Sequence, residues 1–371
     1  MPEIRLPLDG EMKTVRIERA CSYQPPAKPL TSRIAYAAAH VVGEGDRIDW
    51  DATLAYRQHL WSYGLGVAEA MDTSQRGLGL AWEKACKLIA KSLAAAPRGA
   101  LIACGAGTDH IPDEQTVNLD EIQRAYEQQC EFIESRGGRV ILMASRALAR
   151  AAKSADDYVA VYARVLQQLQ RPAILHWLGD RFDPKLAGYW GSSDIGIAMD
   201  TCLAVIRDHA AKIDGIKISL LDAHREIEMR RRLPAGVRMY TGDDFNYDTL
   251  IRGDGAHFSH ALLGIFDAIA PAASAAIGAL DAGCVEEFDR ILAPTIPLSR
   301  TIFEHPTYFY KTGIVFLAWL NGHQDRFKMI GALESARGIE HLSKILVLAE
   351  QAGVLRDPEL ACARMRSLFE S

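Results

Sequence analysis

Lys217 lies between two isoleucines in the apolar stretch KIDGIKISLLD, residues 212–222. Side chains alternate along a strand, so if Ile216 and Ile218 face covering helices, Lys217 faces the interior of a closed sheet. An ammonium group in a desolvated interior has its pKa lowered, which makes the neutral amine available. Such an amine is the nucleophile that forms a Schiff base with a carbonyl substrate. The alternative is a structural lysine paired with an acid such as Asp243.

Eight short apolar runs alternate with longer amphipathic stretches over roughly 230 residues. Strands that alternate with helices predict a parallel sheet with crossover helices, and eight such units match the size of a (β/α)8 TIM barrel. An open doubly wound sheet is the rival architecture, but no GxGxxG motif follows the first run. The runs are RIAYAAAHVV, GVAEAM, ALIACGAG, RVILMAS, PAILHWLG, IDGIKIS, VRMYTGDD and GAHFSHALLG.

In such a barrel the active site lies at the carboxyl ends of the strands, so the polar residues there are candidate site residues. Lys217 belongs to the sixth run and His176 to the fifth. An imidazole can move a proton near neutral pH, although a core histidine bonded to backbone has the same sequence pattern. The other polar residues expected at strand ends are His40, Asp72, Thr73, Ser74, Thr108, Asp109, His110, Ser145, Arg146, Thr241, Asp243, Asp244, His257 and Ser259.

Three segments are predicted along the chain: an N-terminal arm over residues 1–30, the catalytic barrel over 31–285 and a C-terminal helical extension over 286–371. The net charge of −5 argues against a nucleic-acid partner, and no apolar run is long enough to span a membrane. Seven cysteines without a CxxC pair, and a charged N-terminus without a signal peptide, predict a cytoplasmic protein.

Several motifs around Lys217 occur in a characteristic order. GIK belongs to the sixth run, DTS at 72–74 follows the second, PAILHWLG is the fifth, and TGDD at 241–244 ends the seventh. Together with GDGAHFSHALLGIFDAIAPAASAAIGALDAG, they make residues 30–290 resemble the dihydrodipicolinate synthase and N-acetylneuraminate lyase superfamily. The resemblance implies that Lys217 forms the Schiff base, that Thr73 and Ser74 hold the carboxylate of a 2-keto acid, and that the chain forms a homodimer or homotetramer.

The chain departs from the family pattern at the site. The family usually has tyrosine at the position of His176, where it relays protons, so the resemblance implies that role for His176. The family's hydroxyl pair usually follows glycine and precedes Gly-Glu, whereas here Asp72 precedes it and Gln75-Arg76 follow. We therefore expect a divergent member, with Asp72 and Asp243 beside the substrate. The apolar segment YFYKTGIVFLAWL is a candidate core segment or subunit contact.

Three hypotheses follow from these residues. The first is a Schiff-base lyase, an aldolase or dehydratase acting on a 2-keto acid or keto sugar acid, with Lys217 and His176 as catalytic residues and no added cofactor. The second is a divalent-metal-dependent barrel isomerase or aldolase, and the third is a non-catalytic small-molecule sensor. No HxH or HExxH spacing supports the metal site, whose candidate ligands are Glu69, Asp72, His110, His176 and His257.

Overall fold

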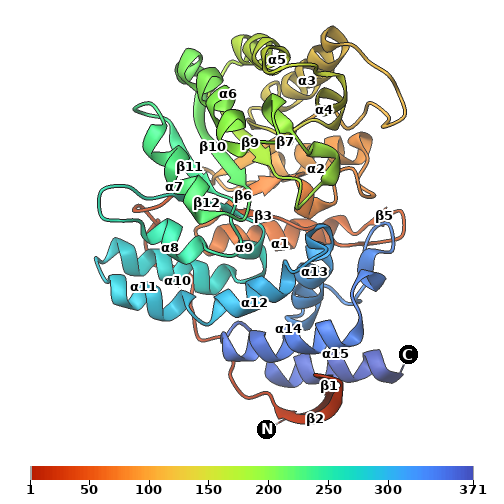
Figure 1. Ribbon diagram of the computed structural model, residues 1–371. Coiled ribbons are helices and arrows are strands. Elements are labelled where there is room, and N and C mark those ends of the chain that lie inside the picture. Colours follow the sequence, from red (N-terminus) through yellow and green to blue (C-terminus); the bar gives the residue numbers. More distant parts are fainter. Residues whose placement is uncertain (1, 371) are drawn as a thin grey trace.

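Eight parallel strands close into a barrel in the computed structural model, which describes residues 2–370 (Figure 1). Each barrel strand pairs with the barrel strands before and after it, and the last, β12 (His260–Leu263), pairs with the first, β3 (Ala35–Ala38). Each of the eight apolar runs contains one of these strands, so the predicted (β/α)8 TIM barrel is confirmed. The other barrel strands are β6 (Gly66–Glu69), β7 (Ile102–Ala106), β8 (Arg139–Leu142), β9 (Ala173–Leu178), β10 (Ile213–Ser219) and β11 (Arg238–Thr241).

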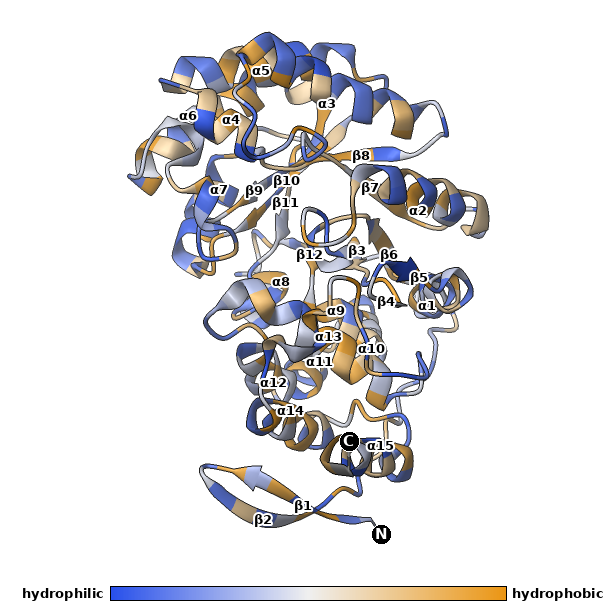
Figure 2. Cartoon of the chain, turned by 90° about the vertical axis from the view of Figure 1, so that its right-hand side faces the viewer, coloured by the Kyte–Doolittle hydropathy of each residue, from blue (hydrophilic) through white to orange (hydrophobic). Residues whose placement is uncertain are grey.

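Helices connect the strands and cover the outside of the barrel. Helix α3 (Leu119–Glu134) begins with a capping box, in which Asn118 and Glu121 each accept the other's backbone N–H. Hydrophilic and hydrophobic residues alternate along such outer helices, because only one face packs on the barrel (Figure 2). The other covering helices are α1 (Trp50–Ser62), α2 (Trp82–Ala95), α4 (Arg146–Ala151), α5 (Ala155–Gln168), α6 (Ile195–Asp208), α7 (Ala223–Arg232), α8 (Tyr247–Arg252), α9 (Ile265–Ala268) and α10 (Ala270–Asp281).

The barrel wall separates two sets of buried side chains. Ile216 and Ile218 of β10 belong to the large core that the strands share with the helices, as the alternation predicts. A second, smaller cluster includes Met71 and Tyr240 and fills the interior. Lys217 is the register partner of Tyr240, so its side chain lies on the interior side of the wall.

Two of the polar residues expected at the carboxyl ends of the strands lie at the opposite end. His257 and Ser259 precede β12, so their expected position is wrong. The physical reason is that only the last part of their run, His260–Leu263, pairs in the sheet. His40 does follow β3, and its Nδ1 lies 3.0 Å from the buried carboxylate of Asp267.

The chain continues beyond the barrel into a layer of helices at one side (Figure 1). The N-terminal arm lies on this layer, with an antiparallel hairpin of β1 (Glu3–Leu8) and β2 (Glu11–Arg16). The Cys21 N–H donates to the Leu355 carbonyl at 2.6 Å, which fastens the arm to the extension. A short ribbon, β4 (Gly43–Glu44) and β5 (Arg47–Ile48), follows β3. The extension contains α11 (Val285–Leu292), α12 (Thr295–Ile302), α13 (Tyr310–Leu320), α14 (Ile339–Gln351) and α15 (Pro358–Glu370).

Helix α13 is buried on every side. All its residues from Tyr310 to Leu320 are buried, and it packs against α9, α12 and α14. This position explains why the segment is apolar around its whole circumference. The expectation of a subunit contact is wrong for this helix, because its faces are covered within the same chain.

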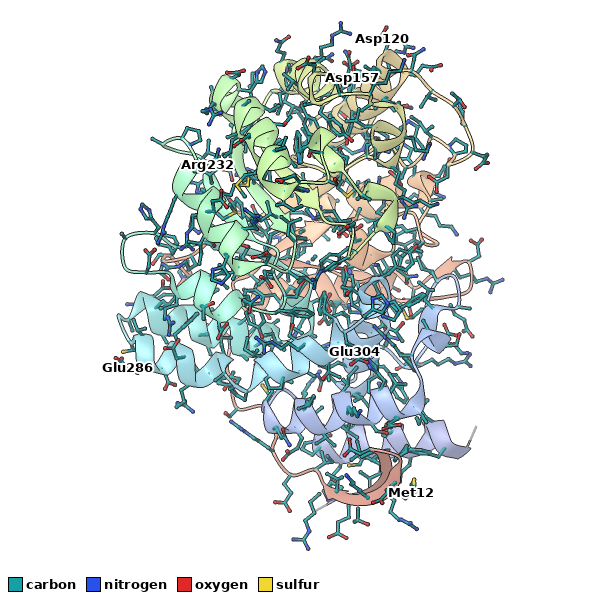
Figure 3. All side chains as sticks on the ribbon, viewed as in Figure 1. Met12, Asp120, Asp157, Arg232, Glu286 and Glu304 are labelled. Carbon is teal, nitrogen blue, oxygen red and sulfur yellow. The ribbon has the colours of Figure 1, made fainter. Side chains whose placement is uncertain are left out.

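Charged side chains gather on the outside of the molecule, and Asp120, Glu286 and Arg232 illustrate this on three different helices (Figure 3). Met12 on the hairpin is also exposed. Within residues 2–370, no helix combines the length and the apolar character needed to cross a membrane.

Candidate active site

Lys217 lies near the carboxyl end of β10, in a small cavity inside the barrel mouth. Its side chain is buried, and Thr73, Asp244 and Tyr310 line the same cavity. Gly242 leaves room for it, because a Cβ at that position would lie 2.7 Å from Lys217 Cε. The cavity volume is about 10 Å³, enough for a single water molecule. The lysine is therefore enclosed and desolvated.

The Lys217 amine has no fixed partner. None of the described residues forms an ion pair or a hydrogen bond with its Nζ. Burial lowers the pKa of Lys217, and the negative charges of Asp244 and Asp72 oppose that shift. Burial likewise raises the pKa of Asp244 to about 7, although the Ile265 N–H donates to its Oδ1 at 2.9 Å. An unpaired, desolvated amine is the form of lysine that nucleophilic chemistry needs.

Asp243 does not line the Lys217 cavity. Its carboxylate accepts hydrogen bonds from the backbone N–H groups of Phe245 at 2.9 Å and Asn246 at 3.2 Å, and from Asn246 Nδ2 at 2.8 Å. These bonds close the turn after β11. The next residue, Asp244, is the acid of this turn that reaches the cavity of Lys217.

The two hydroxyl residues after β6 separate in the structure. They form a short 3₁₀ helix, Asp72–Ser74. Thr73 Oγ1 lies 2.8 Å from Tyr310 Oη, inside the Lys217 cavity. Ser74 Oγ donates instead to the Ala39 carbonyl at 2.5 Å. Thr73 thus reaches the lysine, whereas the Ser74 hydroxyl fastens this segment to the end of β3.

Tyr310 is a residue of the cavity that the sequence pattern did not reveal. Its ring stacks on Phe303, with centroids 4.4 Å apart and planes inclined by 14°. Burial raises the pKa of Tyr310 well above its usual value, so its phenol keeps its proton. Tyr310 starts an apolar helix in the extension, far from Thr73 in sequence, and no spacing rule connects the two.

Gln75 and Arg76 stabilise the same segment where the family has Gly-Glu. Gln75 has a left-handed φ of 66°, a conformation that favours glycine. Its Nε2 donates to the Ile330 carbonyl at 2.7 Å, which offsets the backbone strain. Arg76 forms a bidentate ion pair with Asp109 and also donates to Gln129 Oε1 at 2.9 Å. Both departures from the family pattern therefore have a structural role.

His176 is the register partner of Lys217 on the neighbouring strand β9. Its Nε2 lies 3.3 Å from Ser219 Oγ, and its buried Nδ1 has no partner among the described residues. Burial, and then the charge of Lys217, hold the pKa of His176 well below its usual value. The residue is therefore a neutral imidazole with one free nitrogen beside the lysine.

A larger pocket of about 360 Å³ adjoins the Lys217 cavity. Asp72 and Leu178 line both spaces and so form the partition between them. His176 lines the larger pocket, as do residues that follow β7 and β8, including Thr108, Asp109, Ser145 and Arg146.

The candidate metal ligands do not converge. Both Glu69 carboxylate oxygens accept hydrogen bonds from Arg57 at 2.9 Å. His110 Nδ1 lies 2.8 Å from Gln129 Nε2, and the exposed His257 lies at the other end of the barrel. In the described part of the chain, no group of three or more His, Cys, Asp or Glu side chains is arranged to hold a metal ion.

Solved structures of the dihydrodipicolinate synthase family share this fold. The dihydrodipicolinate synthase from Aquifex aeolicus matches with a TM-score of 0.68 at 13% identity, over 87% of this chain and 99% of its own. YagE is a prophage protein of the dihydrodipicolinic acid synthase family from E. coli K12, and its structure was solved in complex with pyruvate. It matches with a TM-score of 0.68 at 13% identity, over 87% of this chain and 99% of its own. The 4-hydroxy-tetrahydrodipicolinate synthase from Methylacidiphilum fumariolicum SolV matches with a TM-score of 0.67 at 15% identity, over 91% of this chain and 99% of its own. The resemblance noted in the sequence is confirmed at the level of the fold.

No curated protein matches the chain at a significant level. One protein family, described as "Protein of unknown function (DUF993)", matches residues 4–371. The match includes the barrel, the helical extension and every residue of the candidate site. The chain therefore belongs to the DUF993 family and has the fold of the dihydrodipicolinate synthases.

Proposed function

We propose that the protein is a Schiff-base lyase, an aldolase or dehydratase, that acts on a 2-keto acid or keto sugar acid through Lys217. One observation carries the proposal: the Lys217 amine is buried inside the barrel mouth without an ion-pair partner among the described residues. The solved complex of YagE with pyruvate supports a keto acid as the kind of ligand to test first.

Lys217 Nζ would attack the keto carbon, and loss of water from the resulting carbinolamine would give an imine. The protonated imine withdraws electrons from the neighbouring carbons. In an aldolase reaction the β-hydroxyl would lose its proton while the C–C bond breaks, which gives an aldehyde and an enamine, and a proton returned to the enamine carbon restores the imine. In a dehydratase reaction the α carbon would lose a proton and the β carbon would then lose its hydroxyl as water, which leaves a conjugated imine. The remaining carbon skeleton is then released when water hydrolyses the imine, which restores the free lysine. In the reverse direction the enamine forms the new bond.

The other residues fit distinct tasks in this sequence. The Thr73 hydroxyl lies in the cavity, where it is suited to bind the substrate carboxylate. Tyr310 is protonated and bonded to Thr73, so it can supply a proton to the carbinolamine oxygen. His176 has a free nitrogen and would move a proton at the larger pocket, and Asp244, which lines the Lys217 cavity, would balance the charge of the iminium ion.

A keto acid is much larger than the single water molecule that the Lys217 cavity accommodates. We therefore expect Asp72 and Leu178, the partition, to shift when the substrate enters from the larger pocket. Binding of the keto acid would then join the two spaces.

The proposal also includes a cytoplasmic location and assembly into a homodimer or homotetramer. Sedimentation at micromolar protein concentration tests the assembly.

Borohydride trapping tests the proposal directly. The protein is incubated with pyruvate, 2-oxobutyrate or 2-oxoglutarate, reduced with borohydride and analysed by intact mass. We expect the mass of one reduced keto acid per chain for at least one of them, and no gain without borohydride. If no keto acid were trapped, and chelation alone abolished a turnover found by substrate screening, a metal-dependent reaction would replace this proposal.

A further inference from the structure

A further pocket lies outside the barrel wall, between the N-terminal arm, the barrel helices and the helical extension. Its volume is about 380 Å³, which is within the usual size of small-molecule sites. Residues 21–25 of the arm line it, together with residues of α1, α9, α10 and the segments at the ends of α13 and α14. We call it the arm pocket. It shares no lining residue with the Lys217 cavity or with the pocket beside that cavity.

Aromatic rings form much of the wall of the arm pocket. The ring of His323 lies 4.8 Å from that of Tyr56 and 4.5 Å from that of His59, measured between centroids. His59 lies 5.1 Å from Tyr63 in an edge-on arrangement, and Tyr23 adds a ring from the arm. Rings set at such angles present both faces and edges, which are the surfaces that a planar aromatic ligand packs against.

The two imidazoles of this wall are uncharged at neutral pH. Burial lowers the pKa of His59 to about 4 and that of His323 to about 3, and the positive charge of Arg356 contributes to both shifts. Neither ring forms a hydrogen bond or an ion pair with another residue of the described chain. The two rings therefore act as aromatic surface, and each also has one donor and one acceptor nitrogen for a ligand.

Arg356 supplies a positive charge to the arm pocket. Its backbone N–H donates to Asn321 Oδ1 at 2.8 Å, which fixes the position of its main chain. The exposed guanidinium forms no ion pair or hydrogen bond within residues 2–370. Its charge acts on the pKa values of His59, Tyr63 and His323, so the group lies on the pocket side. A guanidinium without a carboxylate partner is well suited to bind one from a ligand.

The acid of the lining does not compete for this arginine. The Asp267 side chain is fully buried, and its carboxylate accepts the His40 backbone N–H at 2.8 Å and lies 3.0 Å from His40 Nδ1. Arginines outnumber acids among the charges that act on the tyrosines and histidines of the pocket from outside its lining. These outer groups are Arg19, Arg57, Arg290 and Arg364, with Glu287 as the acid.

We infer that the arm pocket binds a planar aromatic carboxylate of one or two rings, with its ring against His59, Tyr63 and His323 and its carboxylate on Arg356. The inference goes beyond the proposed function and does not depend on it, because none of these residues lines the barrel mouth. The ligand would contact the arm, the barrel helices and the extension together. Its binding would therefore stabilise the folded chain.

The experiment measures the dissociation constants of three probes by isothermal titration calorimetry on the full chain. The probes have the same carbon skeleton: 2-naphthoate, its uncharged amide 2-naphthamide, and the saturated acid decahydro-2-naphthoate. We expect 2-naphthoate to bind at least about tenfold more tightly than the amide, which lacks the charge that pairs with Arg356. We expect it to bind about three- to tenfold more tightly than the saturated acid, which cannot stack.

Arg356→Gln tests the charge of the pocket. The affinity for 2-naphthoate should fall about tenfold, while the affinity for 2-naphthamide stays unchanged. The matched control is Arg207→Gln at the end of α6. Arg207 is also exposed, forms no ion pair or side-chain hydrogen bond in the described chain and does not line the arm pocket, so this variant should bind both probes normally.

His323→Leu tests the aromatic wall. The imidazole forms no hydrogen bond with the described residues, so leucine leaves no polar partner unsatisfied there. The affinity for 2-naphthoate should fall about three- to tenfold, and the affinity for decahydro-2-naphthoate should stay near its original value.

Three results would overturn the inference. The first is equal affinity for 2-naphthoate and either of the other probes, and the second is unchanged binding of 2-naphthoate by Arg356→Gln. The third is loss of 2-naphthoate binding in Lys217→Ala, which would place the ligand at the barrel mouth. The Schiff-base proposal is tested by keto acid trapping alone, so it stands or fails independently of these measurements.

Discussion

Two neighbouring spaces at the mouth of the barrel differ in size and in the segments that line them. The Lys217 cavity has a volume of about 10 Å³, and Phe182 and Tyr310 are among the residues that line it. The larger pocket has a volume of about 360 Å³ and is lined mostly by residues that follow β7 and β8. Under the proposed function, the closed cavity desolvates the reacting amine, and the larger pocket is the space from which the substrate enters.

The largest effect is expected from the closed cavity. Lys217→Arg keeps the positive charge but has no accessible neutral amine, because guanidinium does not deprotonate at working pH. Turnover should fall by at least about 10⁴-fold, as it does when a covalent nucleophile is removed. Borohydride-dependent adducts should disappear, and circular dichroism should report an intact fold. Lys217→Ala should be equally inactive, and normal activity in either variant would contradict the account.

A smaller effect is expected at the wall between the two spaces. His176→Phe removes the imidazole that we assign to proton movement, so kcat should fall by about 10²–10⁴-fold. The lysine is untouched, so the variant should still be trapped with a keto acid. Loss of trapping together with turnover would mean that His176 only supports the position of Lys217, its register partner.

Tyr310→Phe tests a side chain that lines the Lys217 cavity. The change keeps the ring that stacks on Phe303 and removes the hydroxyl that bonds to Thr73. We expect kcat to fall by about 10–100-fold and the pH dependence of kcat to change, because a proton donor is lost.

The matched control for Tyr310→Phe is Tyr247→Phe. Tyr247 is also buried, and its hydroxyl lies 2.6 Å from Thr295 Oγ1. This variant should lose a similar amount of stability, about 1 kcal/mol, while kcat stays near that of the unaltered protein. Equal losses of kcat in the two variants would argue against a catalytic role for Tyr310.

The smallest effect concerns a carboxyl outside both spaces. Glu226 of α7 accepts a hydrogen bond from Ser259 Oγ at 2.7 Å, and burial raises its pKa from 4.5 to about 8. Between these values the unfolded chain releases a proton that the folded chain keeps, so stability falls as pH rises towards 8. Glu226→Gln removes this slope of up to ~1.4 kcal/mol per pH unit.

Denaturant unfolding of both proteins at pH 4, 6 and 8 measures the difference. Relative to the unaltered protein, Glu226→Gln should gain stability steadily from pH 4 to pH 8. Turnover at a fixed pH should not change, since Glu226 lines neither the cavity nor the pocket. A constant difference in stability across this range would mean that Glu226 is ionised in the folded protein.

The sequence predicted the barrel and the position of Lys217, but not all the contacts around that lysine. The alternation of apolar runs predicted all eight barrel strands, and the period of two around Lys217 predicted its interior position, because both depend on local patterns. The contact of Thr73 with Tyr310 depends on how a distant helix packs, and no local pattern records it. His257 and Ser259 were misplaced because an apolar run does not show where pairing in the sheet begins.

The most direct test of the account is to identify which lysine forms the imine, because the chain contains a second buried lysine. Lys311 is also buried, and burial lowers its pKa to about 8. Its Nζ, however, donates to the Tyr308 carbonyl at 3.1 Å, and Lys311 does not line the cavity. The measurement is peptide mapping by mass spectrometry after reduction with borohydride in the presence of the keto acid that is trapped best. The account predicts one reduced adduct, on Lys217, and an unmodified Lys311; an adduct on Lys311, or an unmodified Lys217 in a trapped protein, would contradict it.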